Sequence, residues 1–219
     1  MPSSDSNQIP AVLKLVSEAK PASILDVGIG WGKYGALFRL CLEDGYPDVS
    51  NRQNWKIQID GIEAFPEYVG DIQRGIYNRI VLQDVQQALA HVGNYDVVFM
   101  GDVIEHLEKS AGHQLLKQLL AKTQKRLIVA TPNGPYAQGS ILGNHFECHR
   151  SSWECADFEC YPHREIYADR KSIIAILSTA PIPAVGRRWQ LSQFRRSPFS
   201  ARISAWLTYR WQRATRKSK

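Results

Sequence analysis

Short apolar runs that alternate with helix-like stretches constrain this chain more than any other feature of its sequence. The runs have the length of buried strands, and between most of them apolar residues recur every three to four positions. The run Tyr95–Gly101, YDVVFMG, is typical of a central strand in a parallel sheet. Strands that alternate with helices are joined by right-handed crossovers, which place helices on both faces of the sheet. The sequence therefore predicts an α/β fold, doubly wound around a mainly parallel, seven-stranded sheet.

The pattern also predicts the order of the elements and the extent of the domain. We expect helices over residues 8–19, 33–42, 85–90, 111–122 and 151–158. We expect strands over residues 22–28, 55–64, 79–82, 95–101, 126–130, 164–168 and 172–177, with the last two spaced as a hairpin. The polar segment 44–54 is expected to be a loop. A length of 219 residues suits one such domain over residues 1–180 and a basic appendage over residues 181–219.

A glycine-rich turn follows the first expected strand. The chain reads ILDVGIGWG there, with Gly28, Gly30 and Gly32 leading into the next expected helix. Glycines let the backbone turn tightly and approach a ligand closely. Glu63 stands at the end of the second strand, where a carboxylate can accept hydrogen bonds from both hydroxyls of a ribose. These features predict a nucleoside-type cofactor, and so far a nicotinamide dinucleotide fits equally well.

Asp26 provides a reason to prefer one of these two kinds of cofactor over the other. It precedes the first glycine by two positions, beside the place where a pyrophosphate would lie. A buried carboxylate there would repel a dianion and would attract the ammonium and sulfonium groups of S-adenosylmethionine. Lys33 also stands where the dinucleotide motif G-x-G-x-x-G requires a glycine. The charge pattern therefore favours S-adenosylmethionine.

Four motifs in a fixed order resemble the class I S-adenosylmethionine-dependent methyltransferase family. The motifs are DVGIGWG, GIEAF, LQDV and YDVVFMGDVIEHL, and the resemblance is firm over residues 23–131 and loose to about residue 177. More narrowly, GKYG, DVIEHL and TPNG look like a bacterial subgroup of that family. The resemblance implies a Rossmann-like methyltransferase fold. The sequence departs from the pattern in its longer connection before Glu63, and the polar segment 44–54 accounts for the excess.

The resemblance also implies which residues bind the cofactor. The matching positions are Asp26, Gly28, Gly30, Gly32, Glu63, Asp84, Val85, Gly101 and Asp102. The first four would hold the methionine part, Glu63 would bind the ribose, and the next two would contact the adenine. The last two would line the cofactor pocket after the fourth strand.

The motif DVIEHL leaves three interpretations open. It follows the central strand at the carboxyl edge of the sheet, where ligands bind in this fold class. In the first, His106 is a catalytic base for an acceptor hydroxyl, assisted by Glu105, because an ordinary imidazole pKa of about 6.5 suits proton transfer near neutrality. In the second, both residues bind a divalent metal with Asp102, completed by His145 or His149, which resembles the metal cluster of small-RNA 2′-O-methyltransferases except that the first acid there is Glu. In the third, Glu105 caps the next helix and His106 is a hydrogen-bonded wall of the pocket. The sequence alone assigns no metal.

A segment rich in His and Cys follows the TPNG motif. Its spacing, C-x6-C-x4-C over residues 148–160, matches no zinc finger or ribbon. We expect instead a lid over the acceptor pocket, with Phe146, Trp153 and Phe158 supplying apolar walls. The four cysteines of the chain are too few for a disulfide scaffold, so we expect reduced thiols.

The positive charge of the chain is concentrated at its end. Of the 27 basic residues, ten fall between Arg187 and Lys219, where no acid occurs, so the rest of the chain holds 17 basic against 21 acidic residues. Residues 197–219 are expected to form a helix with aromatic and apolar residues on one face and arginines around the rest. Such a helix suits a membrane surface. It also suits nucleic acid, or packing against its own domain.

These features favour an enzyme that methylates an oxygen of a small-molecule or lipid-linked acceptor. The first alternative is an RNA methyltransferase guided by the basic tail, with or without a metal. The second is a non-catalytic, cofactor-binding adaptor at the membrane. No apolar run has the length needed to span a bilayer, and the N-terminus lacks the features of a signal peptide. We therefore expect a cytoplasmic protein that is peripheral to the inner face of the membrane. The sequence predicts no oligomeric state.

Overall fold

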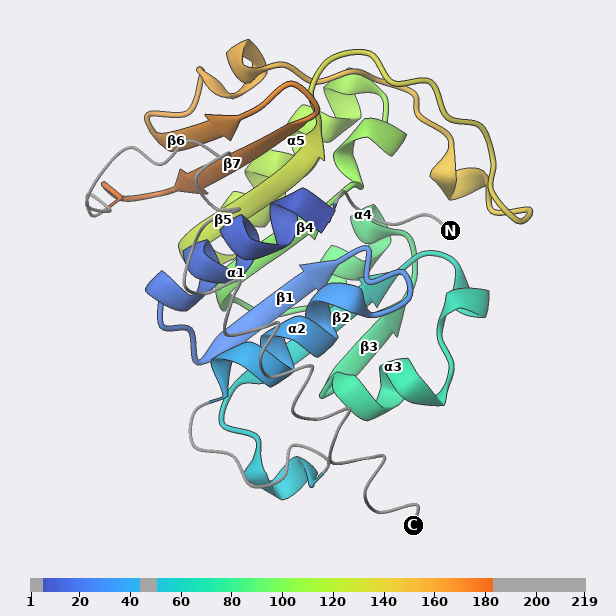
Figure 1. The fold of residues 1–219 in the computed structure, drawn as a ribbon, viewed down its shortest axis with the longest axis vertical. Helices are drawn as coiled ribbons and strands as arrows, with labels where there is room; N and C mark the ends of the chain where they lie inside the picture. Colours follow the sequence, from blue (N-terminus) through green and yellow to red (C-terminus); the bar gives the residue numbers. More distant parts are fainter. Residues whose placement is uncertain (1–5, 44–50, 183–219) are drawn as a thin grey trace.

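The computed structural model describes residues 6–43 and 51–182, which form a three-layer α/β domain (Figure 1). One sheet runs through it in the order β3-β2-β1-β4-β5-β7-β6. The strands are β1 (Ser23–Val27), β2 (Gln58–Glu63), β3 (Arg79–Leu82), β4 (Tyr95–Gly101), β5 (Thr123–Pro132), β6 (His163–Ala168) and β7 (Ser172–Ser178). The α-helices are α1 (Ile9–Glu18), α2 (Lys33–Leu42), α3 (Asp71–Ile76), α4 (Val85–Ala88) and α5 (Lys109–Ala121).

The sheet is mixed. The strand pairs from β3 through β2, β1 and β4 to β5 are parallel, whereas β7 runs antiparallel to both β5 and β6. The expected terminal hairpin is therefore confirmed, and the expectation of a mainly parallel sheet holds for its first five strands. The strand order reverses between β1 and β4, and in open α/β sheets ligands bind outside the carboxyl ends of the strands at such a point.

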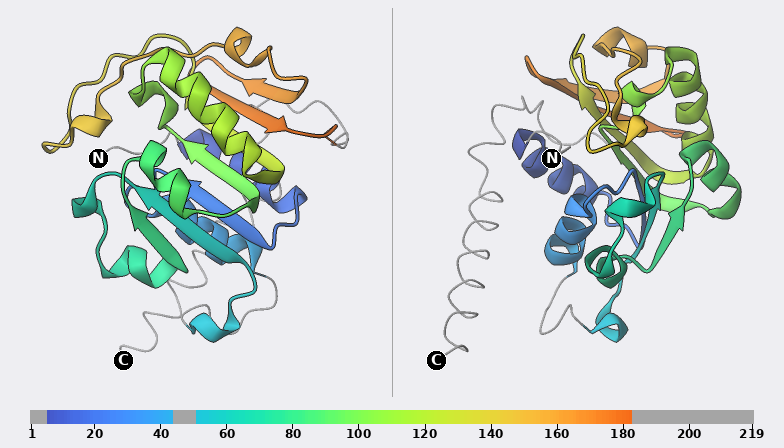
Figure 2. Two further views of the ribbon diagram at one scale, coloured as in Figure 1. Left: turned by 180° about the vertical axis from the view of Figure 1, so that it is seen from behind. Right: turned by 90° about the vertical axis from the view of Figure 1, so that its right-hand side faces the viewer.

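Two hydrophobic cores explain why the central strands are apolar throughout. Along β1, Ile24 packs on the face that α1 and α2 cover, and Leu25 packs on the face that α4 and α5 cover. The neighbouring β4 residues Val97 and Val98 lie in register with them and divide between the same two cores. Figure 2 shows the two helical layers on opposite faces of the sheet. Successive side chains on a strand point to opposite faces, so a strand buried on both sides needs no polar alternation.

The structure differs from the sequence expectations in three places. The six-residue helix α3 was not predicted, because a helix this short shows no clear apolar period. The helix expected over 151–158 is only the 3-10 turn Cys155–Phe158, because Trp153 is held extended in a bridge to Gly134. Strand β5 continues past its expected end at residue 130 to Pro132, because β7 pairs with it as far as that residue.

Some expectations fall on residues that the structure does not describe. The expected loop over 44–54 is described only from residue 51, where Arg52–Asn54 forms a 3-10 turn. The tail helix over 197–219 and the appendage from residue 183 onward lie outside the described residues. Among the described helices, none is long and apolar enough to cross a membrane.

Candidate active site

Two adjoining cavities open at the carboxyl edge of the sheet, around the reversal between β1 and β4. The larger has a volume of about 760 Å³ and the smaller about 330 Å³. Both are lined by residues from the glycine turn, from the segment after β4 and from the segment that follows β5. The residues that line both cavities are Gly28, Gly30, Asp102, His106 and Glu147.

The glycine turn brings backbone, without side chains, to the shared wall of the cavities. Gly28 has a left-handed φ of 75°, and a Cβ at this position would clash with the side chain of Val103. Gly30 also has a positive φ, and a Cβ there would meet open space. Gly32 differs from the expectation, since it is the N-cap of α2, faces Gln73 and lines neither cavity. Its role as a cofactor contact stays a prediction.

Glu63 is fixed at the end of β2 by two backbone amides. The amide of Gly30 donates to Oε2 at 2.8 Å and the amide of Phe65 donates to Oε1 at 2.9 Å. The side chain is only 6% exposed, and burial raises its pKa despite these hydrogen bonds. A carboxylate has about four acceptor sites, so acceptor capacity remains for a ligand in the smaller cavity. Asp84 and Val85 line the same cavity, with Asp84 also capping α4 through Gln86.

Asp26 lies at the end of β1 in the wall of the larger cavity. Its Oδ2 accepts a hydrogen bond of 2.6 Å from the hydroxyl of Tyr77, and both side chains are buried. Burial raises the pKa of Asp26 to about 7, and the nearby charge of Glu63 adds to this. Opposite charge placed beside this carboxyl would favour its ionised form. Tyr77 was not predicted, because it follows the unexpected helix α3.

Gly101 and Asp102 continue from β4 into the cavity wall. Asp102 has a φ of 51°, which is uncommon outside glycine, and its amide donates to the carbonyl of Ala130 on β5 at 2.8 Å. This bond fixes the reversal of the chain after the strand. Asp102 lines both cavities and Gly101 lines the larger one, and their role in lining a cofactor pocket stays a prediction.

Glu105 is buried behind the larger cavity. Its Oε2 accepts a hydrogen bond of 2.9 Å from Thr131 Oγ1, and its Oε1 is buried without a hydrogen-bond partner in the described part of the chain. Burial and the charge of Asp102 raise the pKa of Glu105 well above its ordinary value. The helix-cap interpretation is wrong, because α5 begins at Lys109 and the Glu105 side chain points to β5 instead.

The rings of His106 and His149 face each other beside Glu105. Their rings are 4.9 Å apart, and each Nδ1 faces a backbone carbonyl, of Cys148 for His106 and of Tyr136 for His149. If each Nδ1 carries the proton, each Nε2 keeps a lone pair. Burial and the facing His149 lower the pKa of His106 to about 4, which makes the neutral imidazole a much weaker base than the sequence interpretation assumed.

Ligand atoms of Glu105, His106 and His149 lie within 4.8 Å of one another. Of the two histidines proposed from sequence to complete a cluster, the structure therefore brings His149 to the site, whereas His145 is exposed and outside it. Over residues 6–43 and 51–182, no group of three metal-ligating side chains contains a cysteine. These three residues offer a metal one carboxyl group and two imidazole rings.

The segment after β5 was expected to form a lid over the acceptor pocket, and only part of it lines the cavities. Glu147 and Phe146 line them, and the hydroxyl of Tyr68 donates to Glu147 Oε1 at 3.1 Å, joining the segment to the wall of the smaller cavity. The expectation that Trp153 and Phe158 form acceptor-pocket walls is wrong. Both are fully buried in the core between α5 and the sheet, because Gly112 leaves room for the indole there.

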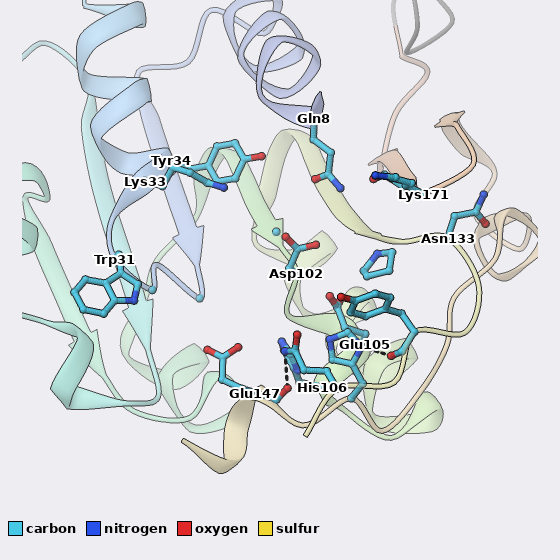
Figure 3. Close-up of a pocket in the computed structure, with 18 of the residues that line it drawn as sticks. Gln8, Trp31, Lys33, Tyr34, Asp102, Glu105, His106, Asn133, Glu147 and Lys171 are labelled. Atoms are coloured by element: carbon cyan, nitrogen blue, oxygen red, sulfur yellow. Dashed lines mark hydrogen bonds between the residues drawn. The ribbon is translucent and has the colours of Figure 1, made fainter. Parts of the chain in front are cut away.

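Several cavity residues were not predicted from sequence. Gln8 comes from the turn before α1, Asn133 from the end of β5, and Arg170 and Lys171 from the β6–β7 turn. Figure 3 shows Gln8, Asn133 and Lys171 around the part of the cavity away from Trp31. They belong to no local motif, and the only sequence signal is their place beside the ends of predicted elements.

Comparison with solved structures places this fold among the methyltransferases. The N-terminal domain of EvdMO1 with SAH bound superposes with a TM-score of 0.56 at 15% identity, covering 78% of this chain and 81% of that one, and the same domain was solved in the presence of SAH and D-fucose. An S-adenosylmethionine-dependent methyltransferase from Archaeoglobus fulgidus gives a TM-score of 0.55 at 14% identity, covering 79% and 94%. The methyltransferase domain of bacterial CtHen1-CN gives 0.50 at 20% identity, covering 78% and 97%.

No family model and no curated protein matches the sequence. The structural likeness shows the fold, which is the Rossmann-like fold of S-adenosylmethionine-dependent methyltransferases. In this chain the sheet of that fold reverses its strand order between β1 and β4. Two cavities open at the carboxyl edge of the sheet there.

Proposed function

We propose that this protein is an S-adenosylmethionine-dependent methyltransferase that methylates an oxygen of a small-molecule or lipid-linked acceptor. The observation that carries the proposal is the pair of cavities with one shared wall. The smaller holds Glu63, Asp84 and Val85, and the larger holds Asp26 and further space lined by polar side chains. A nucleoside in the smaller cavity and an acceptor in the larger would meet at Asp102.

The residues present fit the cofactor. Glu63 retains acceptor capacity for ribose hydroxyls, and Asp26 offers a buried carboxyl to an ammonium group. The bare backbone of Gly28 and Gly30 leaves room for close approach. When bound, S-adenosylmethionine supplies an electrophilic methyl group on a sulfonium, so the protein has mainly to align an acceptor with it.

The surroundings of the cavities suit an acceptor with an apolar part. Of the five exposed large apolar side chains among the described residues, Trp31, Tyr136 and Phe146 line a cavity, whereas Ile72 and Leu142 do not. Exposed aromatic groups beside a binding site favour ligands with apolar surface. This supports the lipid-linked option, and the solved structure in the presence of SAH and D-fucose supports a sugar as the part that is methylated.

Calorimetric titration of the purified protein with S-adenosylmethionine and with its demethylated product tests the cofactor assignment. We expect micromolar binding to the wild type and about 100-fold weaker binding to Glu63→Ala, because hydrogen bonds to a charged group contribute about 1.5–3 kcal/mol each. Glu67→Ala is the matched control, since Glu67 is exposed and lines neither cavity. Absence of binding to the wild type would refute the proposal and favour the adaptor or dinucleotide alternatives.

The cluster of Glu105, His106 and His149 favours a second candidate, a metal-assisted methyltransferase acting on a 2′-hydroxyl of RNA. One carboxyl oxygen without a partner among the described residues and two imidazole rings form a donor set that suits a divalent transition metal. A bound metal would lower the pKa of an acceptor hydroxyl. The basic tail would then serve as an electrostatic guide for RNA.

Manganese titration followed by electron paramagnetic resonance tests this candidate without an activity assay. We expect stoichiometric binding to the wild type that is lost in His149→Ala and retained in His145→Ala, which removes an exposed histidine of the same segment. Equal binding by the two variants, or none by the wild type, would remove the metal from the site. If RNA methylation persists without any metal, the metal-assisted part of this candidate is refuted. Only the basic tail then supports an RNA acceptor.

The role of residues 187–219 is a separate proposal. We propose that this basic stretch holds the protein at the inner face of the membrane, in the cytoplasm. Flotation with anionic liposomes should depend on it, and RNA binding with a steep salt dependence would assign it to nucleic acid instead. Deletion that changes neither membrane binding nor activity on a lipid-linked acceptor would contradict the membrane role. A cellular role that survives loss of Glu105 and His106 would favour the adaptor.

A further inference from the structure

The larger cavity has two chemically different ends. Its acidic wall residues come from β1, from the segment after β4 and from the segment after β5, and they are Asp26, Asp102, Glu105 and Glu147. Arg170 and Lys171 also line this cavity and come from the β6–β7 turn, and Figure 3 shows Lys171 on the side away from Trp31. Lys33 is the remaining lysine of the wall and lies at the glycine turn. A cavity with two cations at the end away from the cofactor residues suits an anionic ligand there.

The turn that carries the two cations is held in place. Asn133, at the end of β5, donates from its amide to the carbonyl of Lys171 at 2.9 Å and from Nδ2 to the carbonyl of Asp169 at 2.7 Å. Asp169 Oδ1 accepts from the amides of Lys171 and Ser172, both at 2.8 Å. Asp169 is the nearest acid in sequence, but it does not line the cavity. These bonds hold the backbone of the turn, from which the exposed side chains of Arg170 and Lys171 line the cavity.

Gln8 adds a second, independent observation at the same end. It is 3% exposed, lines the larger cavity, and its Oε1 is buried with no hydrogen-bond partner among the described residues. In Figure 3 its amide points into the space between Asp102 and Lys171. A buried amide oxygen without a partner is costly, and a ligand hydroxyl would satisfy it.

We infer that this end of the cavity binds a hydroxyl-bearing acceptor that carries a phosphate group, with Arg170 and Lys171 binding the phosphate and Gln8 Oε1 accepting a hydrogen bond from a hydroxyl. The guanidinium of Arg170 can bind two phosphate oxygens at once, and the ammonium of Lys171 adds a point charge. The pair supplies the two positive charges that a phosphate dianion requires. This inference rests on the proposed methyl transfer, because it names the acceptor of that reaction.

Ligand-observed nuclear magnetic resonance titration of the full-length protein, saturated with the demethylated cofactor product, tests the inference. The probes are inorganic phosphate, glucose 6-phosphate, glucose and glucuronate at constant ionic strength. We expect glucose 6-phosphate to bind the wild type and to bind at least tenfold more weakly to the double variant Arg170→Ala, Lys171→Ala. Arg170→Lys with Lys171→Arg should retain binding, since both charges remain.

The matched control removes two other cations. Arg74→Ala with Lys117→Ala has the same net charge as the test variant, and both residues are exposed and line neither cavity. Equal affinity of glucose 6-phosphate for wild type, test variant and control would overturn the inference, as would failure of both phosphate probes to bind the wild type. Tighter binding of glucuronate than of glucose 6-phosphate would overturn the choice of phosphate.

Gln8→Met tests the hydroxyl contact, because methionine fills similar volume without the amide oxygen. We expect severalfold weaker binding of glucose 6-phosphate, unchanged binding of inorganic phosphate and unchanged binding of the cofactor product. Weaker binding of the cofactor product would place Gln8 in the cofactor site and overturn this contact. Because cofactor binding is measured first, its absence would refute the proposed function, whereas its presence without phosphate binding would refute only this inference.

Vesicles distinguish a lipid phosphate from a soluble one. The same protein is sedimented with phosphatidylcholine vesicles that carry phosphatidic acid. Since the basic tail is identical in all variants, a difference between the Arg170→Ala, Lys171→Ala variant and the Arg74→Ala, Lys117→Ala control reports the cavity alone. Weaker sedimentation of the first variant supports a lipid phosphate, and equal sedimentation together with the loss of glucose 6-phosphate binding supports a soluble one.

Discussion

The two sides of the paired cavities, which we propose bind the cofactor and the acceptor, are built in different ways. On the cofactor side, Asp26, Glu63 and Asp102 each stand at or just after the end of a strand, inside a short motif. On the acceptor side, Gln8 and Lys171 come from opposite ends of the described chain and meet only in the folded domain. The ends of adjacent parallel strands meet at one edge of a sheet, so local motifs are enough to build the first side. The second side depends on how loops pack.

The largest expected effect tests what anchors the acceptor side. Trp153 is fully buried, its ring is 5.6 Å from that of Phe158, and its indole N–H donates to Ser151 at 3.0 Å. Trp153→Ala should lower the free energy of unfolding by about 3–5 kcal/mol, measured by urea denaturation. Trp31→Ala, at a half-exposed position, should cost less than about 1 kcal/mol. A loss that small for Trp153 would mean that the segment after β5 is not anchored through the core.

The next effect tests the tight backbone on the cofactor side. Gly28→Ala places a Cβ against Val103 at a left-handed φ, which costs about 1–3 kcal/mol. We expect the affinity for S-adenosylmethionine to fall about 10- to 100-fold by calorimetry, with partial recovery in the double variant with Val103→Ala. Gly75→Ala is the control, because its Cβ meets nothing within 4 Å. Equal affinities of the two glycine variants would show that the cofactor does not use this turn.

A third prediction concerns pH and Asp26. Because the pKa of this carboxyl is raised to about 7, it holds a proton below that pH and cannot pair with an ammonium group. Affinity for the demethylated cofactor product should therefore rise up to about tenfold per unit from pH 5.5 to 7 and level off above. Asp26→Asn should bind weakly and lose this dependence, and titrations in buffers of different ionisation enthalpy should detect the released proton. A pH dependence that persists in the variant would assign it to another group.

The same raised pKa has the opposite effect on the free protein. The folded carboxyl keeps its proton up to about pH 7, whereas the unfolded one releases it near its ordinary value of 3.8. The folded state therefore binds more protons in this range, and its stability falls as pH rises from about 4 to 7. Asp26→Asn should flatten that part of the pH profile of the unfolding free energy. An unchanged slope would show that other groups dominate it.

The smallest expected effect tests the link between the two sides. Tyr68→Phe removes the hydrogen bond to Glu147 that joins the smaller cavity to the segment after β5. We expect about threefold weaker cofactor binding, since one such bond contributes about 0.5–1.5 kcal/mol. Tyr167→Phe removes a similar bond, to Glu165, away from both cavities, and should leave binding unchanged. Equal binding by both variants would mean that the two sides act independently.

The extent to which sequence predicted the site follows the same division. The strand ends that carry Glu63 and Asp102 were predicted, and the structure places both in cavity walls. The resemblance also implied Gly32, which lines neither cavity, because only the first two glycines face the opening. Tyr77 was missed because α3 is too short for its apolar period to show. Trp153 was taken for a pocket wall, since hydrophobicity alone does not say which apolar surface a residue will contact.

The sequence by itself determined the layers of this protein and the kind of cofactor that its first motifs suit. Apolar periodicity and glycine placement are local properties, and the parallel sheet brings them together without further information. Only the tertiary structure decided that Glu105 faces Thr131, that His149 rather than His145 meets His106, and that Gln8 and Lys171 share a cavity. Those contacts join residues from separate elements, so they depend on packing and on the paths of loops, which no local spacing encodes.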